Sequence, residues 1–178
     1  MKLWKVHLKP VSAAHYWIQA GHRADAINWI ADLIRDQAAA ECEKATEALE
    51  LELATLYGNW GVETLVQGAY LREYHTWEKE TKAYFNDQRV LNAENALHWK
   101  SRPPRSHVER IREQMEAFMA TGFDLTPLEY ARVKANVAKH EPGLLTEHFL
   151  TWEEWQALIA AVREFWAHLE ALEDFRLS

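Results

Sequence analysis

The strongest constraint on the fold is a proline-free stretch from Glu41 to Asn86, in which apolar residues recur every three or four positions. This spacing is typical of an amphipathic α-helix and differs from the alternation of a half-buried strand. Glycines 58, 61 and 68 fall inside the stretch, yet each costs a helix only about 1 kcal/mol relative to alanine, and glycine lets a second helix approach closely. Two helices broken near Gly58 and Gly61 are the alternative. We expect one continuous, very long central helix.

Further segments combine helical periodicity with a residue that can cap the start of a helix. They run from Ser12 to about residue 38, from Ser106 to Gly122, from Thr126 to His140, and onward from Thr151. The chain has only 6 glycines and 5 prolines, which disfavours sandwich and low-complexity folds. The predicted fold is therefore an all-α helical bundle of about five helices. It forms a single domain over 1–178, with an N-terminal arm at 1–11 and an irregular connector at 86–106.

The charge of the chain is unevenly distributed. The net charge of −7 argues against a protein whose whole surface binds nucleic acid. Residues 100–140 nevertheless hold 8 basic and 5 acidic side chains, whereas residues 141–178 hold 2 and 8. A polyanion such as RNA is therefore expected to bind, if at all, at 100–140. The alternative is that these charges belong to ordinary solvated helix faces.

The compartment is predicted from what the sequence lacks. The single cysteine, Cys42, cannot form an intramolecular disulfide, and the first residues carry no apolar signal-peptide core. No window approaches the roughly 18 uninterrupted apolar residues of a membrane span. These features favour a soluble, reduced, cytoplasmic protein with no membrane partner.

The most informative run for chemistry lies at the end of the predicted helix 126–140. At 100° per residue, Arg132, Asn136, Lys139 and His140 fall within one stripe of that helix. The stripe could bind a phosphodiester, and His140 could transfer a proton near neutral pH. The alternative is that Lys139 and His140 only complement the negative end of the helix dipole.

A second cluster lies in the long helix around Trp77 and Glu78. Glu78 can share a face with Lys82, and the simple interpretation is a core aromatic beside an exposed ion pair. If Glu78 turned inward, its charge would need a partner, for which Lys139 or Arg132 are natural candidates. Metal sites have little support, because the chain lacks a Glu-x-x-His motif, a His-x-x-x-His motif and a cysteine pair.

Three blocks together resemble bacterial members of the HEPN (higher eukaryotes and prokaryotes nucleotide-binding) superfamily, over about residues 50–172. The blocks are Tyr70 to Lys82, Arg132 to His140 followed by Glu141-Pro142-Gly143, and Phe165 to Leu169. The resemblance implies an all-α, usually dimeric bundle. Many members are metal-independent ribonucleases of toxin-antitoxin, abortive-infection and CRISPR-linked defence systems.

The superfamily motif is an arginine followed four to six residues later by a histidine, often as Arg-Asn-x-x-x-His. Asn136 and His140 match this motif, but Ala135 occupies the position of the arginine. The departure puts catalysis in doubt, although Arg132 lies one turn earlier on the same face. Inactive members of the superfamily serve as binding or dimerisation modules.

The resemblance and the residues together lead to two hypotheses. The first is a HEPN-like, metal-independent endoribonuclease without a cofactor, whose partners are RNA, a second copy of the chain and an antitoxin or other protein. Its residues are His140 as general acid/base, Asn136 to orient it, Arg132 and Lys139 to stabilise charge, Lys134, Arg102 and Arg105 to bind substrate, and Glu78 and Trp77 in support. The second is a non-catalytic helical interaction module. A small-molecule pocket in the bundle core is a weaker third.

Overall fold

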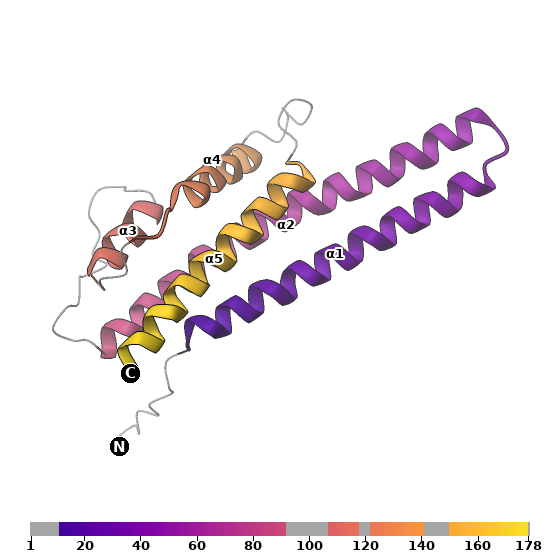
Figure 1. The fold of residues 1–178 in the computed structure, drawn as a ribbon. Coiled ribbons are helices and arrows are strands. Elements are labelled where there is room, and N and C mark those ends of the chain that lie inside the picture. The colour runs from indigo at the N-terminus through magenta and orange to yellow at the C-terminus, as the bar shows by residue number, and fades with distance from the viewer. Residues whose placement is uncertain (1–10, 92–106, 118–121, 141–149, 178) are drawn as a thin grey trace, which may run out of the picture.

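The structure is a computed structural model that describes residues 11–91, 107–117, 122–140 and 150–177, and over these residues the chain forms five α-helices and no strand (Figure 1). The helices are α1 (Ala13–Lys44), α2 (Ala48–Leu91), α3 (His107–Ala117), α4 (Thr126–His140) and α5 (Trp152–Leu177). The predicted all-α helical bundle is confirmed. So is the very long helix, since α2 runs unbroken for 44 residues.

The two longest helices form an antiparallel hairpin that is longer than the rest of the bundle. α5 packs against both α1 and α2, α4 packs against α2 and α5, and α3 packs against α2. α5 covers only the end of the hairpin near the start of α1, so the turn between α1 and α2 projects well beyond it (Figure 1). The molecule therefore has a multi-helix body and a two-helix extension.

Two of the three glycines of α2 explain why α1 and α2 can lie so close. A Cβ atom added at Gly58 would lie 2.5 Å from the Cβ of Ala38, and one at Gly61 would lie 2.9 Å from the Cγ2 of Ile34. Glycine is required at such contacts because no larger residue leaves room for the neighbouring helix. Gly68 has no atom within 4 Å of that position. Helix contact therefore accounts for Gly58 and Gly61 alone.

The helix boundaries differ from the predicted ones at both ends of the hairpin. α1 continues to Lys44 rather than ending near residue 38, because its alanines favour a helix and Ala38 packs against Gly58. The turn falls at 45–47, where the Glu50 carboxylate accepts a hydrogen bond from the backbone N–H of Thr46 at 2.9 Å. α2 then runs to Leu91, so the connector predicted from residue 86 begins too early. Residues 92–106 and 1–10 lie outside the described part.

Of the predicted caps, Thr151 caps its helix, Ser12 occupies the cap position without a side-chain hydrogen bond, and Thr126 lies inside its helix. Thr151 and Glu154 form a reciprocal capping box at the start of α5, with N···O distances of 2.9 and 3.2 Å. Ser12 makes no side-chain cap; instead, the Glu173 carboxylate accepts a hydrogen bond from the N–H of Ala13 at 3.2 Å. At α4, Thr126 donates its N–H to the Asp124 carboxylate at 2.9 Å rather than acting as the cap.

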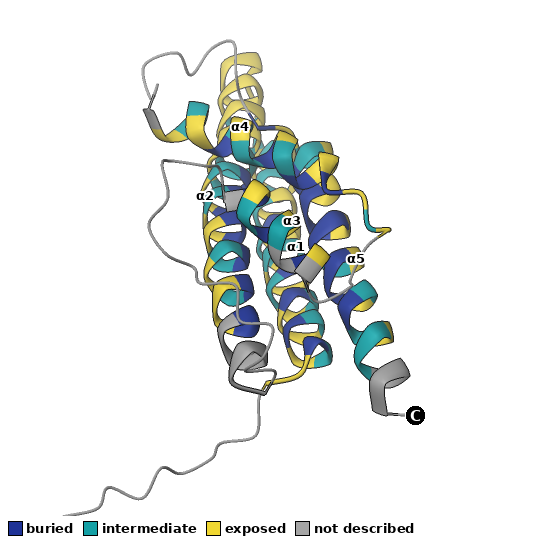
Figure 2. Cartoon of the chain, turned by 90° about the vertical axis from the view of Figure 1, so that its left-hand side faces the viewer, coloured by how far each residue is buried: buried dark blue, intermediate teal, exposed yellow. Residues whose placement is uncertain are grey.

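Aromatic side chains fill the core of the body, where buried residues of the helices face one another (Figure 2). Tyr16 of α1 stacks on Trp166 of α5 with ring centroids 4.6 Å apart, and Trp77 of α2 meets Phe165 edge to face. The core thus joins three helices that are distant in sequence. None of the described helices has an apolar stretch long enough to cross a lipid bilayer.

Candidate functional site

The stripe predicted on α4 borders the buried face of that helix. Leu128, Ala131 and Ala135 are buried, whereas Asn136 and Lys139 are exposed and Arg132 is partly exposed. The 3.6-residue period explains this division, because residues four apart share a face. His140 is the last residue of α4, and its side chain lies outside the described residues, as do Arg102 and Arg105.

Arg132 is paired within its own helix. Its Nε and Nη2 atoms lie 2.8 and 2.7 Å from Oε1 of Glu129, one turn earlier. The hydrogen bond to this carboxylate raises the pKa of Arg132, so the guanidinium stays fully charged. An exposed pair of this kind is weak, so Arg132 is positioned by Glu129 and can still exchange it for another anion.

The stripe faces the part of α2 that carries Tyr74 and Glu78. Tyr74 is buried, and its pKa is raised by that burial and by the nearby Glu78 carboxylate. The charges of Arg132 and Glu129 also reach the Tyr74 hydroxyl. α4 packs against α2, and the charge of Arg132 acts on the buried Tyr74 of that helix.

Glu78 is paired within α2 rather than with α4. Its Oε2 lies 2.9 Å from Nδ1 of His75, three residues earlier. Glu78 is partly exposed and pairs with His75, so the condition under which Lys139 or Arg132 would be its partner, an inward Glu78, is not met. Trp77 is fully buried and packs on Phe165, so it belongs to the core and supports the site only by holding α2 in place.

Lys134 is separated from the stripe. It lies on the opposite flank of α4, where its Nζ is 2.7 Å from Oε1 of Glu154 on α5. Its ammonium also lies 5.5 Å from the ring centroid of Tyr130. The expected substrate-binding role of Lys134 is therefore not supported by its position, since its charge is already neutralised by α5.

A cationic stripe on α2 was missed in the sequence. Arg72, His75, Lys79 and Lys82 follow one another at spacings of three and four, and all four are exposed. They lie on the exposed side of α2, the helix that also carries Glu78. The spacing was visible in the sequence, but it became informative only once α4 was seen to pack along the same part of α2.

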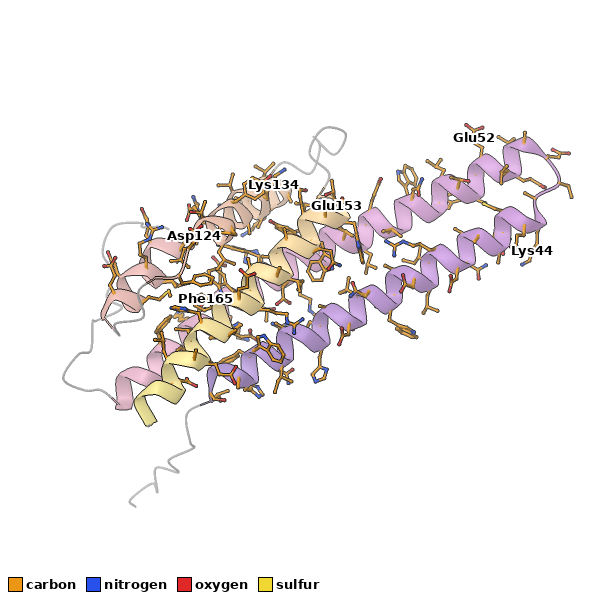
Figure 3. All side chains as sticks on the ribbon, viewed as in Figure 1. Lys44, Glu52, Asp124, Lys134, Glu153 and Phe165 are labelled. Carbon is orange, nitrogen blue, oxygen red and sulfur yellow. The ribbon has the colours of Figure 1, made fainter. Side chains whose placement is uncertain are left out.

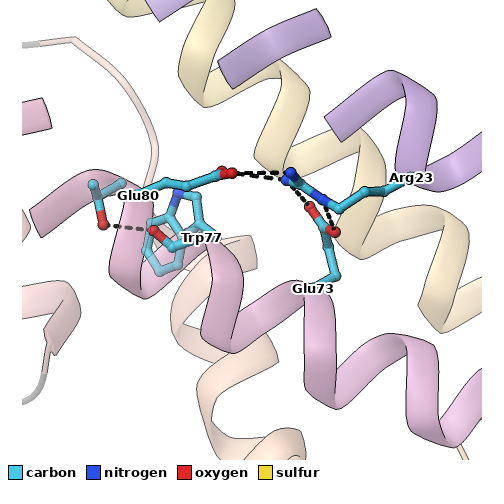
Figure 4. A network of polar contacts seen from close by, with 5 residues as sticks. Arg23, Glu73, Trp77 and Glu80 are labelled. Carbon is cyan, nitrogen blue, oxygen red and sulfur yellow. Dashed lines mark hydrogen bonds and ion pairs between the residues drawn. The ribbon is translucent and has the colours of Figure 1, made fainter. Parts of the chain in front are cut away.

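A partly buried charge network was also missed (Figure 4). The Arg23 guanidinium of α1 donates hydrogen bonds to both carboxylate oxygens of Glu73 and of Glu80, at distances from 2.6 to 3.2 Å. Burial alone lowers the pKa of Arg23, but the two carboxylates outweigh it and raise the pKa overall. The detectable signal was Glu73, an acidic residue between the core positions Tyr70 and Trp77.

Metal or ligand binding elsewhere has less support. Over the described ranges, no group of three His, Cys, Asp or Glu side chains is placed to hold a metal ion. Two grooves, of about 480 and 360 Å³, lie along the α1–α2 hairpin, and both include Gly58 in their lining. Neither groove includes a residue of the α4 stripe.

Compared with known proteins, the chain matches no protein-family model, no curated protein and no solved structure. The resemblance to the HEPN superfamily thus rests on the residue blocks of the chain itself and stays a prediction.

Proposed function

We propose that the chain is a cytoplasmic, HEPN-like protein that binds RNA across the junction of α2 and α4. The observation that carries the proposal is that both helices of this junction expose cationic side chains. Arg72, Lys79 and Lys82 are exposed on α2, and Arg132 and Lys139 lie on α4. Helices that present cations in rows match the regular spacing of phosphates along a nucleic-acid strand.

The proposed chemistry is cleavage of the RNA backbone without a metal ion. The ribose 2′-oxygen attacks the adjacent phosphorus, the bond from phosphorus to the 5′-oxygen breaks, and the products are a 2′,3′-cyclic phosphate and a 5′-hydroxyl. His140 takes the proton of the 2′-hydroxyl and then gives it to the leaving 5′-oxygen, so that no proton is gained or lost overall. Arg132 and Lys139 stabilise the charge that develops on the phosphate, and Asn136 orients His140. A toxin-antitoxin or phage-defence context, with an antitoxin as protein partner, fits this activity.

Binding is tested by fluorescence anisotropy with a labelled single-stranded RNA over a series of salt concentrations. Lys139→Ala is expected to weaken binding. The slope of the logarithm of the binding constant against the logarithm of salt concentration should become less negative by roughly 0.7, because one phosphate contact is lost. Lys134→Ala is the matched control from the same helix, because Lys134 is held by Glu154. Wild-type protein that binds no RNA, or equal effects of the two variants, would contradict the proposal.

Cleavage is tested separately, by comparing wild-type protein with His140→Ala on the same RNA and by expressing each alone to score growth arrest. Loss of cleavage and of toxicity in a variant that keeps its helix content and RNA affinity supports the enzyme. Equal cleavage by both proteins contradicts it.

A second candidate, a non-catalytic interaction module, is favoured by Ala135. This residue, which stands where the superfamily has its arginine, is 1% exposed and packs in the core. An arginine there would carry its charge into the body of the protein, away from the stripe. RNA binding without cleavage by the wild-type chain would favour this candidate over the enzyme.

A further inference from the structure

One seam of mostly apolar residues runs along nearly the whole of α2, with the polar residues Glu63 and Gln67 between its outer and inner halves. Its positions alternate by four and three residues, which is the spacing of a coiled-coil contact. They are Leu49, Leu53, Leu56, Trp60, Glu63, Gln67, Tyr70, Tyr74, Trp77, Thr81 and Tyr84.

The inner half of the seam is an established interface. Tyr70, Tyr74, Trp77, Thr81 and Tyr84 are all buried, where α4 and α5 pack against α2. Tyr84 meets Trp166 of α5 edge to face, with ring centroids 5.6 Å apart. In the body of the protein, this seam therefore serves helix packing.

The outer half of the same seam is open. Leu49, Leu53, Leu56 and Trp60 are 63%, 40%, 45% and 57% exposed. They lie on the hairpin extension, whose free end is marked by Lys44 and Glu52 in Figure 3. α1 does not cover them, because it contacts α2 through Gly58 and Gly61 on another face of the helix. No described helix packs over the outer half of the seam as α4 and α5 pack over the inner half.

We propose that a second copy of this chain covers the outer half of the seam, through antiparallel pairing of the two α2 helices. A two-fold axis that passes between Leu53 and Leu56 places Leu53 of one copy against Leu56 of the second copy, and Leu56 of the first against Leu53 of the second. The same axis sets Leu49 against Trp60. In the pair, the two α2 helices pack against each other and each α1 lies on the far side of its own α2, so that the seam residues of both chains are buried.

The apolar area agrees with a homodimer. With large side chains of roughly 150–250 Å², the exposed fractions of the four seam residues and the flanking Tyr57 leave roughly 500 Å² open on each chain. A standard interface buries about 800 Å² on each partner, and homodimer interfaces are about 65% apolar. The seam therefore supplies the apolar share of such an interface, and its polar flanks supply the rest.

Charge and shape select the antiparallel orientation. Around the proposed axis, Glu52 comes opposite Asn59, and Glu50 comes opposite Tyr57, so no two like charges face each other. The bodies then extend in opposite directions. In a parallel dimer the bodies would lie side by side, and α4, which packs over the inner half of the same seam, would stand between them.

The proposal is tested by sedimentation equilibrium of the full chain at micromolar concentrations. Wild-type protein is expected to be a dimer, whereas Leu53→Glu and Leu56→Lys, each alone, are expected to be monomers with unchanged helix content by circular dichroism. Trp29→Glu is the matched control, because Trp29 is 64% exposed on α1 but lies outside the seam. This variant is expected to stay dimeric.

Mixing the two monomeric variants tests the orientation. Only in the antiparallel arrangement does Glu at 53 meet Lys at 56, so an equimolar mixture is expected to recover a dimer. A monomeric wild-type chain would overturn the proposal and leave the seam to a different protein partner. Loss of the dimer in Trp29→Glu, or folded variants that fail to pair when mixed, would overturn it as well. None of these outcomes depends on RNA binding.

Discussion

The guanidinium of Arg23 donates two parallel hydrogen bonds to the carboxylate of Glu73, from Nε to Oε2 at 2.6 Å and from Nη2 to Oε1 at 2.8 Å. The two residues are 50 positions apart and lie on different helices of the hairpin. Glu73 is 2% exposed, so its charge depends on this one cation and its hydrogen bonds. Contacts between small or aliphatic side chains still form when two long helices shift along each other. An ion pair with two parallel hydrogen bonds forms in only one alignment of the two helices.

Removal of this cation is expected to be costly. Arg23→Met leaves Glu73 and Glu80 without their partner inside the bundle, which should lower the free energy of unfolding by about 3 kcal/mol. Urea denaturation followed by circular dichroism measures the loss. Lys44→Met is the control, since Lys44 pairs with Glu41 at the exposed end of α1 and such pairs contribute at most about 1 kcal/mol. Losses of equal size would contradict the prediction.

The same network gives the stability a dependence on pH. Burial raises the pKa of Glu80, and the hydrogen bonds from Arg23 offset this only in part. The folded chain therefore binds this proton more tightly than the unfolded chain. The stability that Glu80 contributes is full below its ordinary pKa of 4.5 and is lost as the pH rises through the raised folded value.

Glu80→Gln isolates this contribution, because glutamine cannot titrate. The free energy of unfolding of the wild type, relative to that of the variant, is expected to fall as the pH rises from below 4.5 toward neutrality. Urea titrations of both proteins at matched pH values measure the difference. A difference that grows with pH would show that Glu80 is stabilised as a carboxylate, contrary to the prediction.

Much of the fold was predictable because helix signals are local. The spacing of apolar residues predicted the number of helices and the continuity of α2, and Thr151 predicted the start of α5. The turn at 45–47 was predicted too early, at about residues 38–41, because no glycine or proline marks it. Its position depends on Glu50 and on the contact between Ala38 and Gly58, and the second of these joins two helices.

The candidate site was likewise predictable only where its features lie within a single helix. The stripe of Arg132, Asn136 and Lys139 follows from the geometry of a single helix. The position of Lys134 does not, because its partner Glu154 belongs to α5. Likewise, Arg23 shows no sign in the sequence of pairing with residues on α2. Contacts within one helix turn were accessible, whereas contacts between helices required the structure.

Two glycines of α2 are expected to respond oppositely to alanine. Gly68→Ala should raise the free energy of unfolding by about 1 kcal/mol, because alanine favours the helix and meets no atom within 4 Å. Gly58→Ala places its Cβ 2.5 Å from that of Ala38, and overpacking of this kind costs about 1–3 kcal/mol. Thermal unfolding separates the two. Ala38→Gly should rescue Gly58→Ala, and a stabilising Gly58→Ala would contradict the close packing of α1 and α2.

The pairing of Arg132 with Glu129 predicts how RNA binding can be strengthened. Glu129→Gln removes the carboxylate that competes with a phosphate for the guanidinium, so affinity should rise several-fold and the salt dependence should steepen. Glu153→Gln changes the net charge equally but lies on α5, away from the stripe. Anisotropy titrations of both variants distinguish a local effect from a general one. If both gain equally, overall charge alone governs the affinity, and Arg132 does not contact the RNA.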